Sequence, residues 1–124
     1  MPTPQIISII DDDAWARQGI NDLVVSMGYQ TATFASAEEF LQSGYIETTK
    51  CVVTDVQMPG LNGLDLQDWL REQGYRISVI LVTAYPDDKY RARALAAGAV
   101  GFLTKPFDDE SLIQCLTLAV GRPN

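Results

Sequence analysis

The stretch IISIIDDD at residues 6–13 joins an apolar, β-branched run to three consecutive carboxylates. Later runs also pass from apolar residues into polar ones: CVVTD at 51–55, SVILVT at 78–83 and VGFLTKP at 100–106. The carboxyl ends of parallel strands meet at one edge of a sheet, and ligands of open α/β proteins bind in the crevice outside that edge. The sequence therefore predicts that carboxylates, the Thr83 hydroxyl and the Lys105 ammonium gather at one end of a parallel sheet.

Helical signals alternate with the strand-like runs. The expected strands are Gln5–Ile10, Tyr29–Phe34, Cys51–Asp55, Ser78–Thr83 and Val100–Thr104. Apolar spacing and terminal glycines indicate helices over Ala14–Met27, Ala37–Gln42, Leu64–Gln73, Asp87–Ala97 and Asp108–Val120. This alternation implies a parallel sheet covered on both faces. Because the second and fifth strands are the most polar, we place them at the edges, which gives the order 2-1-3-4-5 of the doubly wound, flavodoxin-like α/β fold.

The amino-acid composition limits the classes of protein to which this chain can belong. The 124 residues are 47% hydrophobic and 20% charged, which is typical of one globular domain, here residues 1–124. The net charge of −7, without a run of Lys or Arg, argues against direct nucleic-acid contact. No apolar run approaches the roughly 18 residues of a membrane span and no signal peptide is visible, so we expect a cytoplasmic protein. The tail from Gly121 to Asn124 is expected to be a plain terminus or the start of a linker.

Two residue types limit the chemistry further. Cys51 and Cys115 both lie in apolar sequence, which favours buried reduced thiols over a disulfide or a metal pair. The chain contains no histidine, which excludes acid–base catalysis by histidine and histidine metal ligands from within it.

The acidic residues suit a hard divalent cation. Mg²⁺ prefers oxygen ligands and is usually held by one or two carboxylates together with phosphate oxygens. Asp12 and Asp55 follow strands expected to be neighbours, and Asp11 is placed to act through a water. For Asp11 and Asp13 an alternative stays open, namely that they only cap the following helix, and Asp13 is expected to be such a cap.

Asp55 is the candidate nucleophile. A carboxylate can attack a phosphoryl group to form an aspartyl phosphate, and such a transfer depends on position and on positive charge. Lys105 would supply charge and Thr83 a hydroxyl donor, whereas a lone Asp after a strand is more often a turn residue. The Lys105-Pro106 bond is a candidate cis peptide, since X-Pro bonds adopt this form most readily.

The quoted motifs, together with TDVQMPG at 54–60 and Gly63, resemble the receiver domain of two-component response regulators. The resemblance covers essentially the whole chain, implies a CheY-like fold, and is strongest to the FixJ-type branch in GAVGFL at 98–103 and SAEEFL at 36–41. It implies that Asp55 is the phosphoacceptor and that Asp12, Asp55 and the Gln57 backbone carbonyl bind Mg²⁺ or Mn²⁺ directly. Asp11 would bind the ion through water.

The resemblance also implies a switch. Thr83 and Lys105 would contact the phosphoryl group, and Phe102 would be the aromatic switch residue that rotates inward. The implied partner is a sensor histidine kinase, whose phosphohistidine is the donor. The chain is either a single-domain receiver or a receiver cut from a longer protein that carries a DNA-binding output domain. A phosphorylation-linked homodimer through Asp87–Ala97 and Val100–Thr104 is expected. The receiver would be no enzyme beyond catalysing its own phosphorylation and dephosphorylation.

Rival functions are a phosphorylation-independent, receiver-like interaction module and a Mg²⁺-dependent aspartyl-phosphate phosphatase. The phosphatases carry an Asp-x-Asp signature, and Asp55-Val56-Gln57 lacks its second acid. A flavin-binding protein of this fold would need a phosphate loop after the first strand, where three acids stand instead.

Overall fold

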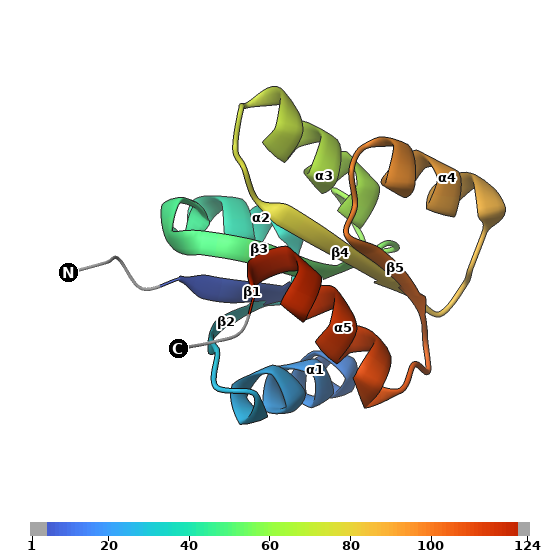
Figure 1. The fold of residues 1–124 in the computed structure, drawn as a ribbon. Coiled ribbons are helices and arrows are strands. Elements are labelled where there is room, and N and C mark those ends of the chain that lie inside the picture. Colours follow the sequence, from blue (N-terminus) through green and yellow to red (C-terminus); the bar gives the residue numbers. More distant parts are fainter. Residues whose placement is uncertain (1–4, 122–124) are drawn as a thin grey trace.

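The computed structural model describes residues 5–121 and contains one five-stranded parallel sheet in the order β2-β1-β3-β4-β5 (Figure 1). Its strands are β1 (Ile6–Ile10), β2 (Gln30–Phe34), β3 (Thr49–Asp55), β4 (Ser78–Thr83) and β5 (Gly101–Thr104). The predicted strand order is confirmed, with the two most polar strands at the edges. Residues 1–4 and 122–124 lie outside the described residues, as do both predicted domain limits and most of the predicted tail.

Two layers of helices cover the sheet. The helices are α1 (Ala14–Ser26), α2 (Ala37–Gln42), α3 (Gly63–Glu72), α4 (Asp88–Ala96) and α5 (Asp109–Val120). Figure 1 shows α1 and α5 on one face, with α2, α3 and α4 on the other. Within residues 5–121, no helix has the length and apolar character needed to cross a bilayer.

The central strands supply both hydrophobic cores. On β4, Val79 and Leu81 pack in the core beneath α2, α3 and α4, whereas Ile80 and Val82 pack in the core beneath α1 and α5. Successive side chains of a strand point to opposite faces, so a strand buried on both sides must be apolar throughout. This is the physical reason for the continuous apolar run at 78–83. Cys51 and Cys115 are free and buried in the second core, which confirms the prediction for them.

Each α-helix begins at a side-chain cap. The caps are Asp13, Ser36, Asn62, Asp87 and Asp108. Asp13 accepts the Trp15 N–H at 3.0 Å, which confirms it as a cap. Asp87 and Asp108 precede their helices, so the predicted starts of α4 and α5 were each one residue early.

The sequence missed the segment before β3. A short 3-10 helix spans Ile46–Thr48, and β3 begins at Thr49 instead of Cys51. Thr49 and Lys50 are polar, so they did not extend the apolar run from which the strand was predicted. Thr49 is nevertheless buried, because its hydroxyl donates to the Tyr45 carbonyl at 2.7 Å and lies 2.7 Å from the Ser8 hydroxyl.

Gly63 stands where α3 approaches the end of β3. A Cβ at this position would collide with the backbone carbonyl of Asp55 and would press against the Leu81 side chain. Gly63→Ala should therefore lower the free energy of unfolding, by about 2 kcal/mol or more. Gly19 is a matched control inside α1, since nothing lies within 4 Å of its added Cβ.

Gly19→Ala should be neutral or raise stability by roughly 0.5–1 kcal/mol through helix propensity. Urea denaturation of the two variants compares them directly. Equal effects of both substitutions would show that α3 can shift away from β3 at little cost.

Candidate functional site

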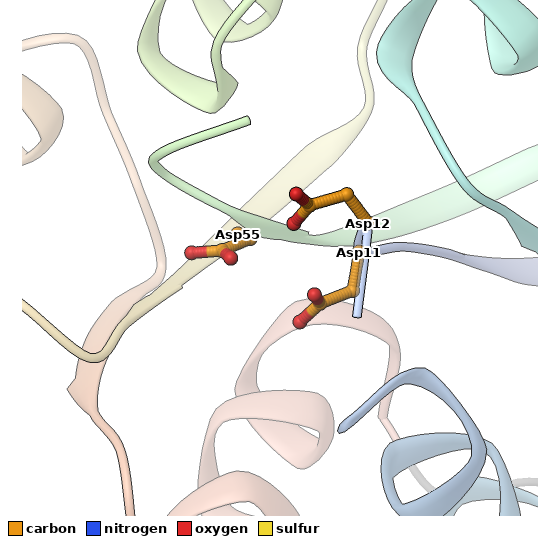
Figure 2. A group of neighbouring side chains, drawn as sticks. All are labelled: Asp11, Asp12 and Asp55. Carbon is orange, nitrogen blue, oxygen red and sulfur yellow. The ribbon is translucent and has the colours of Figure 1, made fainter. Parts of the chain in front are cut away.

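Three carboxylates meet at the carboxyl edge of the sheet. Asp11 and Asp12 follow β1, and Asp55 ends β3, which pairs directly with β1. Ligand atoms from the three side chains lie within 4.8 Å of one another (Figure 2). Asp11 is fully buried and Asp55 is 9% exposed, whereas Asp12 is open to solvent. The cluster therefore has a buried floor and one accessible side.

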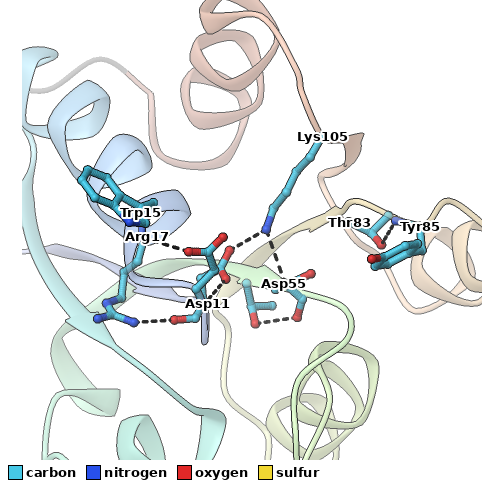
Figure 3. Close-up of polar contacts among 9 residues, drawn as sticks. Asp11, Trp15, Arg17, Asp55, Thr83, Tyr85 and Lys105 are labelled. Atoms are coloured by element: carbon cyan, nitrogen blue, oxygen red, sulfur yellow. Dashed lines mark hydrogen bonds and ion pairs between the residues drawn. The ribbon is translucent and has the colours of Figure 1, made fainter.

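Asp11 is held on every side. Its backbone N–H donates to the Phe34 carbonyl at 3.1 Å, which ties the turn to β2. Its Oδ1 accepts the Asp13 N–H at 2.9 Å, and its Oδ2 lies 2.7 Å from Lys105 Nζ. Its backbone carbonyl accepts from Arg17 Nη1 at 2.7 Å (Figure 3). Asp11 thus lies in the carboxylate cluster, and the cap of α1 is Asp13 and not Asp11.

Arg17 was missed by the sequence reasoning. It lies four residues after the cap Asp13, and helical side chains lean toward the helix amino terminus, so Arg17 reaches back to the turn. The spacing was readable, but the acceptor is a backbone carbonyl that carries no sequence signal. The half-buried guanidinium also brings positive charge to an acidic turn.

Lys105 is the cation of the site. It follows β5, its bond to Pro106 is cis, and its N–H donates to the Thr83 carbonyl at 2.7 Å. Its ammonium lies 2.7 Å from Asp11 Oδ2 and 3.4 Å from Asp55 Oδ2 (Figure 3). Burial alone would lower the pKa of Lys105, but the hydrogen bond and charge of Asp11, with the charge of Asp55, raise it above its ordinary value. Lys105 is therefore a fixed positive charge.

The Asp55 carboxyl is less easily ionised than an ordinary Asp side chain. Burial raises its pKa most, the Lys105 charge opposes this, the Asp11 charge adds to it, and the Gln57 N–H lowers it. The net result is a pKa above the ordinary value for Asp. One ammonium thus does not fully compensate two buried carboxylates, and a second cation at the open side would favour ionised Asp55.

Thr83 ends β4 at the same edge of the sheet, and Phe102 lies on β5, the strand that Lys105 follows. Thr83 is fully buried at the end of β4, and its Oγ1 accepts the Tyr85 N–H at 3.0 Å, which leaves its hydroxyl hydrogen available to donate (Figure 3). Phe102 is 7% exposed and packs in the core beneath α2, α3 and α4. The expected inward rotation of Phe102 therefore has no outward starting position here, because the residue is already buried.

The loop after Asp55 is hydrogen-bonded to α2. Gly60 has φ +80°, and the Glu38 carboxylate accepts the Leu61 N–H at 2.9 Å. This hydrogen bond is the main reason that the pKa of Glu38 lies below its ordinary value. The loop contains Gln57, whose side chain is exposed. Glu38 was missed because its contact is with a backbone amide 23 residues away.

This arrangement brings several carboxylate oxygens, among them those of the partly exposed Asp55, and a fixed ammonium together in one place. The sequence of residues 7–117 matches the family model described as the response regulator receiver domain. The chain belongs to the response regulator receiver family.

Relatives and solved structures agree with this assignment. The receiver is 38% identical to Nodulation protein W of Bradyrhizobium diazoefficiens over 97% of this chain and 53% of that protein. It is 37% identical to the transcriptional regulatory protein FixJ of Azorhizobium caulinodans over 98% of this chain and 58% of that protein. The response regulator StyR has a similar structure, with a TM-score of 0.86 and 33% identity over 94% of this chain and 59% of that one. The receiver thus spans just over half the length of these proteins.

Because the pKa of Asp55 is raised in the folded protein, the free energy of unfolding should depend on pH. Folded, metal-free receiver holds this proton to a higher pH than the unfolded chain, so stability falls as pH rises from the ordinary Asp pKa of about 4 through the raised value. Asp55→Asn removes this loss. We expect the variant to melt a few degrees above the wild type at neutral pH without divalent cations, with the difference shrinking as pH is lowered toward about 4.

Thermal unfolding followed by circular dichroism over this pH range measures the difference. A difference between the two proteins that does not change with pH would contradict the stated electrostatic origin.

Proposed function

We propose that this receiver is a phosphorylation-activated switch whose acceptor is Asp55. The observation that carries the proposal is the contact of Lys105 with Asp55 beside two further carboxylates at the edge of β1 and β3. Asp55 ends β3, the middle strand of the sheet, and its carboxylate retains partial exposure for a donor to approach.

The reaction we propose is phosphoryl transfer from a phosphohistidine on a sensor kinase. An Asp55 carboxylate oxygen attacks the phosphorus, the new O–P bond forms, and the P–N bond breaks with its electron pair left on the imidazole. Lys105 meets the negative phosphoryl oxygens as a point charge, and Thr83 donates its free hydroxyl hydrogen to one of them. The donor histidine must come from the partner, because this chain contains none.

The residues present fit a divalent cation. Asp12 and Asp55 would hold Mg²⁺, or Mn²⁺, with the Gln57 backbone carbonyl, and Asp11 would act through a water. The donors are all hard oxygens, and the repulsion among their charges is what such an ion relieves. When bound, the ion neutralises charge on the transferring phosphoryl group. The Glu38 contact fixes the loop that carries Gln57, and the Arg17 contact fixes the turn that carries Asp11 and Asp12.

The decisive experiment follows modification by intact mass. Incubation with acetyl phosphate and Mg²⁺ should add the mass of one phosphoryl group to the wild type and nothing to Asp55→Asn. Asp12→Ala should slow the addition by on the order of tenfold or more, because the exposed metal ligand is lost.

Asp13→Ala is the matched control. Asp13 neighbours the cluster but caps α1, so its loss should lower stability by about 1 kcal/mol and leave the phosphorylation rate nearly unchanged. Wild-type receiver that gains no mass would favour the interaction-module alternative. Release of phosphate from a generic phosphomonoester would instead favour the phosphatase alternative.

We propose that the surface that changes on phosphorylation, and through which the receiver dimerises, is formed by α4 and β5. The partners we propose are a sensor histidine kinase, a DNA-binding output domain and a second copy of the receiver, and we place the receiver in the cytoplasm. Leu95 on α4 is 47% exposed and offers an apolar contact for a two-fold interface. Arg93 does not contribute, because it pairs with Asp65 at 2.9 Å and Asp68 at 2.8 Å within its own chain. Tyr90 packs partly against the core, which limits it as an anchor.

Sedimentation with and without beryllofluoride, which mimics the phosphoryl group, tests the dimer. We expect the activated wild type to dimerise, Leu95→Glu to weaken the dimer, and Val25→Glu to leave it intact. Val25 is a matched control because it is 50% exposed on α1, away from α4. A monomer at high concentration in both states would exclude the dimer and leave Asp55 phosphorylation unaffected.

A further inference from the structure

The turn that carries Asp12 is fixed at each of its peptide groups. The Asp11 N–H donates to the Phe34 carbonyl at 3.1 Å, and the Asp13 N–H donates to Asp11 Oδ1 at 2.9 Å. Within residues 5–121, the peptide group between these two is held only through the Asp11 carbonyl, which accepts from Arg17 Nη1 at 2.7 Å (Figure 3). Arg17 therefore sets the orientation of the peptide group that joins Asp11 to Asp12.

The direction of the Asp12 side chain depends on this backbone. Its carboxylate is exposed, and it forms no ion pair with any residue in the described part of the chain. The carboxylates of Asp11 and Asp55, in contrast, are both held by Lys105. A rotation of the peptide group between Asp11 and Asp12 would move the Asp12 Cα–Cβ bond and the carboxylate with it. Groups that orient a metal ligand in this way affect metal affinity nearly as much as the ligand does.

Arg17 is itself firmly placed. Its backbone N–H donates to the Asp13 carbonyl at 2.9 Å in the first turn of α1, and Ile20 and Val24 bury that helix in the core. Its side chain is half-buried. A donor that leaves a packed helix is held more precisely than one on a loop. The guanidinium is thus a fixed support for the turn.

The charge of Arg17 opposes a cation at the cluster. Among the residues that the structure describes, ion pairs involve only the cations of Arg93 and Lys105, so no carboxylate neutralises Arg17. A positive charge bonded to the turn repels Mg²⁺, so removal of the charge alone should strengthen metal binding. Loss of the hydrogen bond has the opposite effect, because it releases the orientation of Asp12. The charge and the hydrogen bond of Arg17 therefore predict changes of opposite sign.

We propose that Arg17 is a positioning residue of the divalent-cation site, which acts through the Asp11 carbonyl to orient the Asp12 carboxylate. The gain from this orientation exceeds the repulsion between the guanidinium and the ion. The inference rests on the proposed function for its metal ligands, but it concerns metal affinity and not the transfer of a phosphoryl group.

Titration of the full chain with Mg²⁺, followed in ¹H–¹⁵N spectra, measures the affinity without any phosphoryl transfer. Arg17→Met keeps an apolar stem but removes both the donor and the charge, and we expect it to bind Mg²⁺ about tenfold more weakly than the wild type. In metal-free spectra of this variant the Asp12 amide should shift, since its nitrogen shares a peptide group with the Asp11 carbonyl. Mg²⁺ should still bind at the same cluster.

Two further variants separate the hydrogen bond from the charge. Arg17→Lys should bind Mg²⁺ within about threefold of the wild type, because an ammonium can also donate to a carbonyl. Arg71→Met removes an exposed positive charge from α3 and should leave the affinity unchanged. If Arg17→Met does not fold, Arg17→Gln gives the same comparison, since its shorter side chain does not reach the carbonyl.

Phosphorylation kinetics add an independent measurement. With acetyl phosphate, the Mg²⁺ concentration that gives half the maximal rate should rise in Arg17→Met by the factor found in the titration. The rate at saturating Mg²⁺ should stay within about threefold of the wild type, because Arg17 acts on metal binding and not on the bond that forms.

The sign of the change in affinity decides the proposal. Unchanged or tighter Mg²⁺ binding in Arg17→Met would overturn it, because only the charge of Arg17 would then matter. Affinity in Arg17→Lys as low as in Arg17→Met would overturn it too, because the retained donor would have no effect. A wild type that binds Mg²⁺ but gains no phosphoryl group would contradict the proposed function and leave the assignment of Arg17 intact.

Discussion

The ion pair between Lys105 and Asp11 is the constraint on which the site depends. Asp11 is fully buried, and a buried carboxylate is tolerated only when it is paired and hydrogen-bonded. Lys105 pairs with it at 2.7 Å and lies at 3.4 Å from Asp55, so one ammonium serves two carboxylates. Burial first, and then the charge of Asp11, raise the pKa of Asp55. The negative charge that Lys105 leaves uncompensated prepares this edge of the sheet to accept a cation.

Much of the fold was predictable because its signals are local. Polarity predicted β2 and β5 at the edges, the continuous apolar run predicted β4 inside the sheet, and Asp13 was recognised as a cap. The clustering of Asp11, Asp12 and Asp55 followed from strand order alone, because parallel strands bring their carboxyl ends together. Arg17, Glu38 and Gln67 were missed for a common reason. Each contacts a backbone group that comes within reach only after helices and loops have packed.

Helix α4 buries fewer residues than any other α-helix in the described part of the chain. Ala94 is its only buried residue, whereas α3 buries Leu64, Leu66 and Leu70. Polar contacts replace the missing apolar ones, namely the pairs of Arg93 with Asp65 and Asp68 and the bond from Gln67 to the Ala94 carbonyl. Exposed ion pairs stabilise by only about 0–1 kcal/mol each. A helix held in this way can change position at a smaller free-energy cost than one anchored in the core.

The connection from Asp55 to α4 runs through the end of β4. The Lys105 N–H binds the Thr83 carbonyl, and the Thr83 hydroxyl accepts the Tyr85 N–H in the loop that leads to Asp87, the cap of α4. To change the ratio of active to inactive conformation from 1:99 to 99:1, phosphorylation must stabilise the active conformation over the inactive one by about 5.5 kcal/mol. Burial of Phe102 does not supply it, because the ring is already buried in this structure. Under the proposed function, the difference must therefore come from the Thr83 hydroxyl and the Lys105 ammonium exchanging their present partners for phosphoryl oxygens. That exchange would act directly on the loop before α4, where the helix is held mainly by polar contacts.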